Sequence, residues 1–425
     1  MMPTDGPEPE LIRGQNAPYI RQHNRRLILH VLRTEAPLSR RRIAESTGLQ
    51  PATVTNIVGE LIAMGLAQEI GQSRSRSSAG GRPQVLVDLN ANAAHVGGVY
   101  IGIRRIYVSI VDIKGTVLAC ERLMRPASTQ GVARVAASTL RRLGRGVGVP
   151  VSAMAAIGLA VVVSATVRAA DPETESVRLG AALAAILEAE LGKPVLDDRG
   201  PVAMVLAESL FGAVSDARCI LVHVGTTVSA GVQWGHRLFG RFGYWPSPIG
   251  HTIVDPDGVE CLCGARGCLD TVASERYLAD RAARAARGRL RTLLGTPEFD
   301  PRQRGSEAIG EAAAHGDALA MRLVDEAAGA LGVAIANALQ IINADTAVIA
   351  GPILTAGDRL LVPLRERVTA LLAGSRGRRV RIVPTAFGLD APFVAGPSLA
   401  LDRSIFGPYA RANPRQRAVA LSARS

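Results

Sequence analysis

The chain lacks the features that would assign it to a membrane or to the cell exterior. Its 425 residues contain no apolar run of about 18 residues, the length that a membrane-spanning helix needs. The N-terminal segment MMPTDGPEPE carries acids and prolines in place of the basic and apolar stretches of a secretion signal. We therefore expect a cytoplasmic protein.

Cysteine is scarce, and the positions of the five cysteines argue against a secreted disulfide framework. Cys120 and Cys219 stand alone in the sequence, whereas Cys261, Cys263 and Cys268 fall within eight residues. Such a cluster in a cysteine-poor chain points to a bound metal.

Lysine is nearly absent, because Lys114 and Lys193 are the only two and 47 of the 49 basic residues are arginine. This bias can reflect nucleotide composition as readily as function, so the distribution of the formal charge of +12 is more informative than its size. Between Arg13 and Arg82 there are eleven arginines and four glutamates. Clustered basic side chains release counterions from a phosphate backbone, so this local excess points to nucleic acid.

Apolar patterning divides the chain into four segments. Residues 1–20 are rich in proline and polar groups and are expected to lack fixed structure. Residues 21–85 show helical spacing, which predicts three short helices followed by a wing or linker, Gly71–Pro83, that cannot bury an apolar face. In residues 86–407 strand patterns alternate with helical ones, which predicts an α/β domain of roughly 300 residues with two lobes and a cleft. Residues 408–425 form a basic, loosely held tail.

Residues 40–59, RRRIAESTGLQPATVTNIVG, have the pattern of a helix-turn-helix. Ala44 supplies the small residue where the two helices touch, and Gly48 supplies the positive φ of the turn. Ser39 can cap the first helix, and Pro51 suits the start of the second, where its missing N–H costs little. The alternative is a three-helix packing module that does not bind DNA.

The second helix of this motif is expected to present polar side chains to a DNA major groove, where Asn or Gln can pair bidentately with adenine. Thr55 and Asn56 can equally contact phosphates. For Arg74, Arg76 and Arg82 two interpretations stay open, an arm in the minor groove and a solvated linker. The predicted DNA-binding residues are Arg40, Gln50, Ala52, Thr53, Thr55, Asn56, Arg74, Arg76 and Arg82.

The segment GHTIVDPDGVECLCGARGCLD has the spacing His-x9-Cys-x-Cys-x4-Cys from His251 through Cys261 and Cys263 to Cys268. Three thiolates and one imidazole make a closed tetrahedral zinc site, which braces structure because no coordination position is left for water. The alternative is a set of buried thiols without metal.

At this point the sequence resembles the ROK family, which groups repressors, uncharacterised reading frames and sugar kinases. Besides the helix-turn-helix and the cysteine segment, the resemblance is carried by GRP at 81–83, GVYIGIRRIYVSIVDIKG at 98–115, GTTVSAG at 225–231 and AGPILTAGDRLL at 350–361. It covers most of the chain. The resemblance implies the actin-like, two-lobed ATPase fold of sugar kinases, and dimers or tetramers that respond to sugars or their phosphates.

The resemblance also implies where a kinase would carry its chemistry, and this chain departs from the pattern there. Tyr100 stands where the family has an aspartate that helps to hold metal and nucleotide. Counting back from Glu208 places Arg199 and Gly200 at the sugar-binding Asn-Asp pair, and neither can act as the base. Pro248 replaces a glutamate that grips sugar hydroxyls.

Three further positions extend this departure. The second phosphate loop, residues 225–229, carries branched side chains where the family is rich in glycine. The strand LAVVVSATV, residues 159–167, runs on where the first lobe usually has a Pro-Gly turn. Asp197 and Asp198 would replace the base only through a shifted loop. The degenerate ligand-binding residues are then Arg199, Gly200, His251 and Asp270.

The sequence thus predicts a ROK-type transcriptional regulator, a repressor without kinase activity, that holds a structural zinc. Its expected partners are double-stranded DNA with an inverted-repeat operator, further copies of itself in a homodimer or homotetramer, and a small-molecule effector. Loss of the polar clamp argues against an ordinary hexose as that effector. Two alternatives stay open: an active ATP-dependent sugar kinase, and a regulator whose ROK domain only oligomerises.

Overall fold

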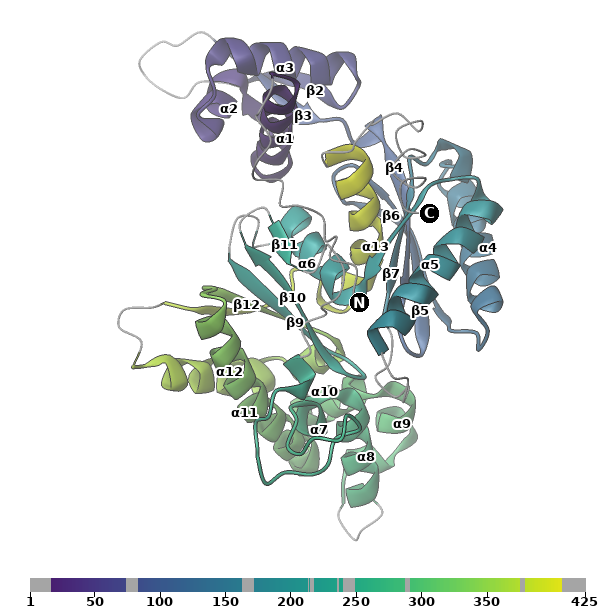
Figure 1. Cartoon of the computed structure of the whole chain (residues 1–425), viewed down its shortest axis with the longest axis vertical. Coiled ribbons are helices and arrows are strands. Elements are labelled where there is room, and N and C mark those ends of the chain that lie inside the picture. The colour runs from purple at the N-terminus through teal and green to yellow at the C-terminus, as the bar shows by residue number, and fades with distance from the viewer. Residues whose placement is uncertain are drawn as a thin grey trace, which may run out of the picture. The chain divides into compact units, whose positions relative to one another are not determined.

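The computed structural model describes residues 17–73, 83–162, 172–212, 214, 218–234, 237–239, 249–286, 291–374 and 379–406 (Figure 1). Contacts divide the chain into two compact units, one of the residues up to Ala93 with those from Arg403, the other of Ala94–Asp402. None of the described helices is both long and apolar enough to span a bilayer.

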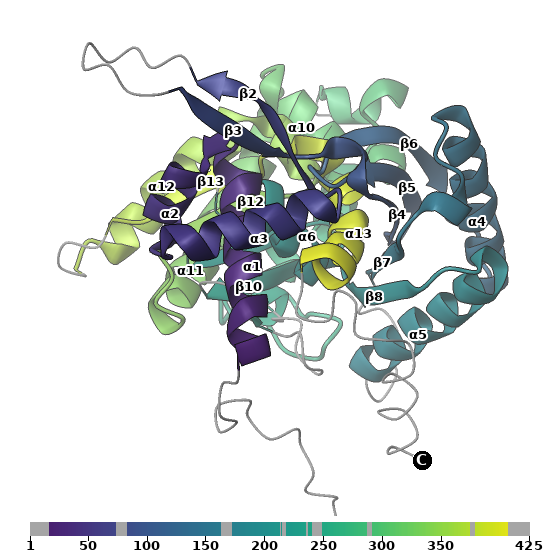
Figure 2. The ribbon, with the colours of Figure 1, turned by 90° about the horizontal axis from the view of Figure 1, so that it is seen from above.

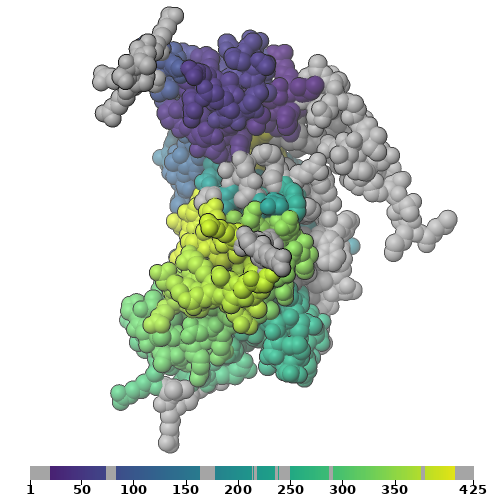
Figure 3. All heavy atoms as spheres, turned by 90° about the vertical axis from the view of Figure 1, so that its left-hand side faces the viewer, coloured from purple at the N-terminus to yellow at the C-terminus, as the bar shows by residue number. Residues whose placement is uncertain are grey.

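The first unit is a winged helix-turn-helix whose atoms pack as one body, in purple in Figure 3. Its elements in chain order are α1 (Ala17–Glu35), β1 (Leu38–Ser39), α2 (Arg40–Thr47), α3 (Pro51–Ala63), β2 (Ala67–Ser73) and β3 (Gln84–Leu89). The strands form an antiparallel sheet in the order β1-β3-β2. Ile28, Leu32, Ile43 and Leu61 are buried between the helices, which is why apolar residues recur at three- and four-residue steps.

The prediction for the start of this unit was wrong in two respects. The first helix begins at Ala17, inside the segment 1–20 that was expected to lack structure, and with 19 residues it is not short. Its apolar stripe, which includes Leu29 and Val31, is buried, and this packing stabilises the helix beyond what its own residues would.

The second unit contains two five-stranded sheets with the same topology. The first, in the order β6-β5-β4-β7-β8, consists of β4 (His95–Ile101), β5 (Arg105–Asp112), β6 (Val117–Met124), β7 (Ile157–Val161) and β8 (Val195–Arg199). The second, in the order β11-β10-β9-β12-β13, consists of β9 (Cys219–Val224), β10 (Val228–Trp234), β11 (Arg237–Phe239), β12 (Thr346–Ala350) and β13 (Arg381–Pro384). In each, three antiparallel strands are extended by two parallel ones.

Helices cover both sheets. They are α4 (Thr129–Gly146), α5 (Pro172–Leu191), α6 (Gly200–Phe211), α7 (Asp270–Ala273), α8 (Glu275–Ala286), α9 (Pro301–Arg304), α10 (Ser306–Ala314), α11 (Ala318–Ile341), α12 (Asp358–Leu372) and α13 (Ala391–Leu401). The apolar core of the first sheet lies under α4 and α5, and that of the second lies under the helices from α7 to α12. In Figure 2 α4 and α5 lie on the face of the first sheet away from α13.

The helix that ends each half packs on the sheet of the other half. Although α6 follows the first sheet, it contacts β9 and β10, whereas α13 follows the second sheet and contacts β4 and β7. Glycine permits both approaches: a Cβ on Gly98 would lie 2.0 Å from Pro397 Cδ, and a Cβ on Gly231 would lie 2.5 Å from the Pro201 oxygen. This exchange brings the two sheets to a common centre.

The long apolar strand predicted over residues 159–167 is shorter than expected, because β7 ends at Val161. Residues 163–167 of that prediction lie outside the described part of the chain.

Candidate functional site

The helix-turn-helix is built by the residues that the sequence singled out. Ser39 caps α2, its hydroxyl accepting the Arg42 N–H at 3.3 Å. Gly48 ends the helix with φ 67° and donates its N–H to the Ala44 oxygen at 2.9 Å, and Pro51 then opens α3. The turn therefore fixes the angle at which α3 leaves α2.

Helix α3 has one buried face and one exposed polar face. Val54, Ile57, Val58 and Leu61 are buried, whereas Gln50, Ala52, Thr55 and Asn56 are exposed and Thr53 is half-buried. The Thr55 hydroxyl donates to the Pro51 oxygen at 2.9 Å, so its only proton is already engaged within the helix. The amides of Gln50 and Asn56 are exposed and carry both the donor and the acceptor that a bidentate pair with adenine needs.

Arg40 has a structural partner in this unit. Its guanidinium lies 2.9 Å from a carboxylate oxygen of Glu69 and so ties the start of α2 to β2. A phosphate contact by Arg40 would have to share or replace this pair. Arg74, Arg76 and Arg82 lie outside the described residues.

The predicted metal ligands come together in the second unit. The ligand atoms of His251, Cys261, Cys263 and Cys268 all lie within 4.8 Å of one another. Cys261 Sγ is 3.7 Å from His251 Nδ1, and Cys263 Sγ is 3.6 Å from Cys268 Sγ. Zinc–sulfur bonds of about 2.3 Å in a tetrahedron place ligand atoms about 3.8 Å apart, so four such donors fit one ion.

Glycines shape the loop that carries the thiols. Gly264 and Gly267 adopt φ values of 91° and 69°, and the Cys261 N–H donates to the Ala265 oxygen at 2.7 Å. A Cβ on Gly267 would lie 1.5 Å from the Asp255 oxygen, so only glycine allows the chain to fold back here.

Asp270, one of the predicted ligand-binding residues, has a structural contact. Its carboxylate is buried and accepts the Val228 N–H at 2.6 Å, at the start of β10. Burial raises the pKa of this carboxyl group, whereas the Val228 hydrogen bond favours its charged form. The side chain therefore links the metal loop to the strand that follows the second phosphate loop.

Tyr100 and Gly200, which the sequence resemblance predicts at the metal-binding and base positions of the kinases, lie against one another. Tyr100 is only 3% exposed, and its hydroxyl lies 4.0 Å from Met204 Sδ. A Cβ on Gly200 would lie 2.9 Å from the Tyr100 oxygen and 2.4 Å from Val162 Cγ2. The tyrosine side chain thus occupies the space that a catalytic carboxylate at position 200 would need.

The neighbouring polar residues serve the fold. The Glu208 carboxylate is buried and accepts the Ala386 N–H at 2.9 Å and the Thr385 hydroxyl. Arg199 is the residue before α6, and its N–H donates to Asp198 Oδ1 at 2.8 Å. Asp197, Asp198 and Arg199 are not among the residues that line the cavity described next, and Pro248 lies outside the described residues.

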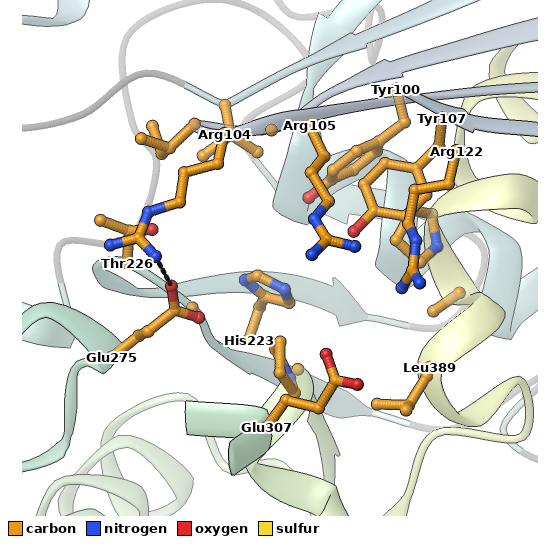
Figure 4. A pocket seen from close by; sticks show the side chains of 18 of the residues that line it. Tyr100, Arg104, Arg105, Tyr107, Arg122, His223, Thr226, Glu275, Glu307 and Leu389 are labelled. Carbon is orange, nitrogen blue, oxygen red and sulfur yellow. Dashed lines mark ion pairs between the residues drawn. The ribbon is translucent and has the colours of Figure 1, made fainter. Parts of the chain in front are cut away.

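A cavity of about 130 Å³ lies beside Tyr100 (Figure 4). The sequence patterns did not predict a functional role for the charged residues that line it. Arg104 and Arg105 begin β5 or immediately precede it, and Arg122 comes from β6. Thr226 of the second phosphate loop and Gly351 line it from other elements. The Arg-Arg pair directly after Ile103, in the segment that carries the family resemblance, was the available signal.

Comparison with known proteins identifies the family. The sequence profile of the ROK family matches residues 96–403, and one described as winged helix-turn-helix DNA-binding matches residues 21–75. The chain belongs to the ROK family. The predicted family and fold class are therefore confirmed.

Two relatives that are named regulators align with this chain over most of their length. The chain is 28% identical over 369 residues to the DNA-binding transcriptional dual regulator NagC of Escherichia coli K12, covering 83% of this chain and 85% of that protein. It is 22% identical to the xylose repressor of Bacillus subtilis 168, covering 90% of this chain and 96% of that protein.

Solved structures share the fold. A ROK family transcriptional regulator described as a homolog of the E. coli MLC protein aligns with a TM-score of 0.67 and 22% identity, covering 90% of this chain and 96% of that one. A ROK family glucokinase of Streptomyces griseus, in complex with glucose and AMPPNP, aligns at 0.61 with 24% identity and covers 72% of this chain and 99% of its own. The present ROK protein is a DNA-binding transcriptional regulator.

Proposed function

We propose that this ROK regulator represses transcription by binding an inverted-repeat operator as a homodimer or homotetramer. The observation that carries the proposal is the exposed polar face of α3, whose opposite face is buried in a winged helix-turn-helix. A two-fold dimer presents two such helices to two half-sites, which gives the operator its symmetry. The name of the xylose repressor of Bacillus subtilis supports the sign of control, whereas NagC is named a dual regulator.

The division of labour follows the two units. The boundary expected between residues 85 and 86 is wrong, because it falls inside β3, which pairs with β1 and β2 of the winged helix. The first unit would bind DNA, with the amides of Gln50 and Asn56 reading bases and Ala52, Thr53 or Thr55 contacting methyl or phosphate groups. The second unit, Ala94–Asp402, would supply self-association and respond to an effector. Such a protein would act in the cytoplasm.

Selection of bound sequences from random duplex DNA, at a stated physiological salt concentration, tests this proposal. We expect the full chain to enrich one inverted-repeat motif. The double variant Thr53→Ala/Asn56→Ala should lose the motif, whereas Gln130→Ala, an exposed substitution on α4, should keep it. Only salt-sensitive binding without enrichment would contradict the assignment of α3.

We also propose that the cluster of His251, Cys261, Cys263 and Cys268 holds a structural zinc ion. Three sulfurs and one nitrogen match its preferred donors, and four protein ligands leave no open position for a reacting water. The ion would hold the loop between η4 (Ile249–His251) and α7 and, through Asp270, the start of β10. Metal analysis of purified protein should return one zinc per chain, and a folded wild type without zinc would refute the site.

A further inference from the structure

The cavity beside Tyr100 carries an excess of positive charge. Four arginines line it, Arg104, Arg105, Arg122 and Arg304, against the two acids Glu275 and Glu307. Burial lowers the pKa of His223, so this residue adds no charge near neutral pH.

Two of the four arginines are already engaged. Arg104 lies 4.0 Å from the Glu275 carboxylate and donates to the Arg302 oxygen at 3.0 Å. Arg304 pairs with Glu307 at 3.0 Å and with Glu311 at 2.6 Å. Glu275 and Glu307, the two acids of the cavity, therefore each form an ion pair with an arginine.

Arg105 and Arg122 remain, and within the described part of the chain the side chain of neither makes a hydrogen bond or an ion pair. Both side chains point into the cavity on either side of Tyr107 (Figure 4). Their position follows from the sheet, because Arg122 is the cross-strand partner of Tyr107 and Arg105 lies two residues before it on the same face.

The tyrosine between them is held rigidly. The Tyr107 ring makes edge contacts with Tyr100 at 6.0 Å and with Phe393 at 5.3 Å between ring centres. Burial is the main cause that raises the pKa of Tyr107, which keeps its hydroxyl a neutral donor. Two guanidinium groups and one hydroxyl therefore face the same space.

We propose that Arg105, Arg122 and Tyr107 bind the phosphoryl group of a small anionic effector, without a metal ion. Guanidinium groups match phosphate oxygens bidentately, and a dianion balances the two charges that the cavity leaves unpaired. The arrangement differs from a nucleotide site, since side chains of β5 and β6 supply the donors and Tyr100 occupies the place of the metal-binding carboxylate. Phosphate binding by these three residues does not depend on DNA binding. That the ligand acts as an effector rests on the proposed regulatory function.

Calorimetric titration of the full chain with inorganic phosphate and with pyrophosphate, in EDTA at constant ionic strength, tests the site. We expect saturable binding that weakens by about tenfold or more in Arg122→Gln and in Arg105→Gln. Arg134→Gln, which removes an exposed arginine of α4 outside the cavity, should bind as the wild type does. Thermal unfolding of each variant shows whether it is folded, which separates lost binding from lost structure.

Four results would overturn the assignment. They are no saturable binding of either phosphate probe, equal binding by the wild type and Arg122→Gln, binding of succinate in preference to phosphate, and binding of AMPPNP only when Mg²⁺ is added. None of these titrations contains DNA, so a failure here leaves the operator experiment unaffected, and failure of the operator experiment leaves these titrations unaffected.

Discussion

Replacement of Gly200 by alanine tests whether Tyr100 and Val162 fill the space that a side chain at position 200 would need. The added Cβ would lie 2.4 Å from Val162 Cγ2 and 2.9 Å from the Tyr100 oxygen, well inside the separation of about 3.5 Å at which carbon atoms pack without repulsion. Overpacking of this kind costs about 1–3 kcal/mol. Alanine regains about 0.5–1 kcal/mol of helix propensity at the start of α6, so we expect Gly200→Ala to lower the free energy of unfolding by about 1–2 kcal/mol.

Urea denaturation of the ROK domain within the full chain provides the measurement, and double-mutant cycles assign the cause. In a Val162→Ala background the Cγ2 atom is gone, so the cost of Gly200→Ala should fall by at least about 0.5 kcal/mol. Tyr100→Phe removes the second close atom and should relieve a smaller part. Gly329→Ala on α11 is the matched control, because a Cβ there meets no atom within 4 Å, and it should leave stability unchanged or raise it.

A neutral or stabilising Gly200→Ala would refute this reasoning. So would a cost that stays the same in the Val162→Ala and Tyr100→Phe backgrounds, since the contacts that define the closed centre would then have no energetic weight. In either case the space beside Gly200 would be open to a side chain, and the loss of the kinase base would need another explanation.

The remaining predictions concern the other parts of the molecule. Asn56→Ala should relax preference at one operator position by about 1–3 kcal/mol in competition binding, and unchanged preference would remove this residue from base recognition. Cys263→Ser should abolish zinc retention and lower the free energy of unfolding by at least about 2 kcal/mol, whereas Cys120→Ser, which changes an exposed lone cysteine, should do neither. Burial lowers the pKa of His223 to about 4, so between about pH 6.5 and pH 4 the unfolded chain binds a proton at this residue that the folded chain does not. The free energy of unfolding should therefore fall by about 1–2 kcal/mol on acidification from about pH 7 to about pH 5. His223→Gln should reduce this loss in denaturation series across that range. Gly200→Asp should show no phosphorylation of glucose or xylose with ATP and Mg²⁺, and turnover above the wild-type background would revive the kinase alternative.

Local patterns predicted the winged helix and the metal ligands. Gly48 and Pro51 act within a few residues of their own positions, so their backbone preferences are visible in the sequence. The spacing from Cys261 to Cys268 is likewise a local property, although the approach of His251 depends on the loop between them. The metal and the base-reading residues themselves stay predictions.

Long-range pairing limited what the sequence could reveal about the cavity. Arg122 meets Tyr107 only because of the register between β5 and β6, which shifts between Ile110 and Val111. A displacement of one residue would turn Arg122 to the opposite face of the sheet. The exchange of α6 and α13 between the sheets is equally non-local, since no periodicity in either helix states which sheet it will cover.

The shared topology of the two sheets has an evolutionary consequence. Each half runs through three antiparallel strands, two parallel strands and a closing helix that packs on the other half. Tandem duplication of one ancestral unit would produce this correspondence, and helix exchange makes the two halves interdependent. The halves differ in what they carry: the earlier one contributes most of the cavity arginines, and the later one carries the cysteine loop between β11 and α7. Each specialisation could therefore arise while the other copy preserved the ancestral framework.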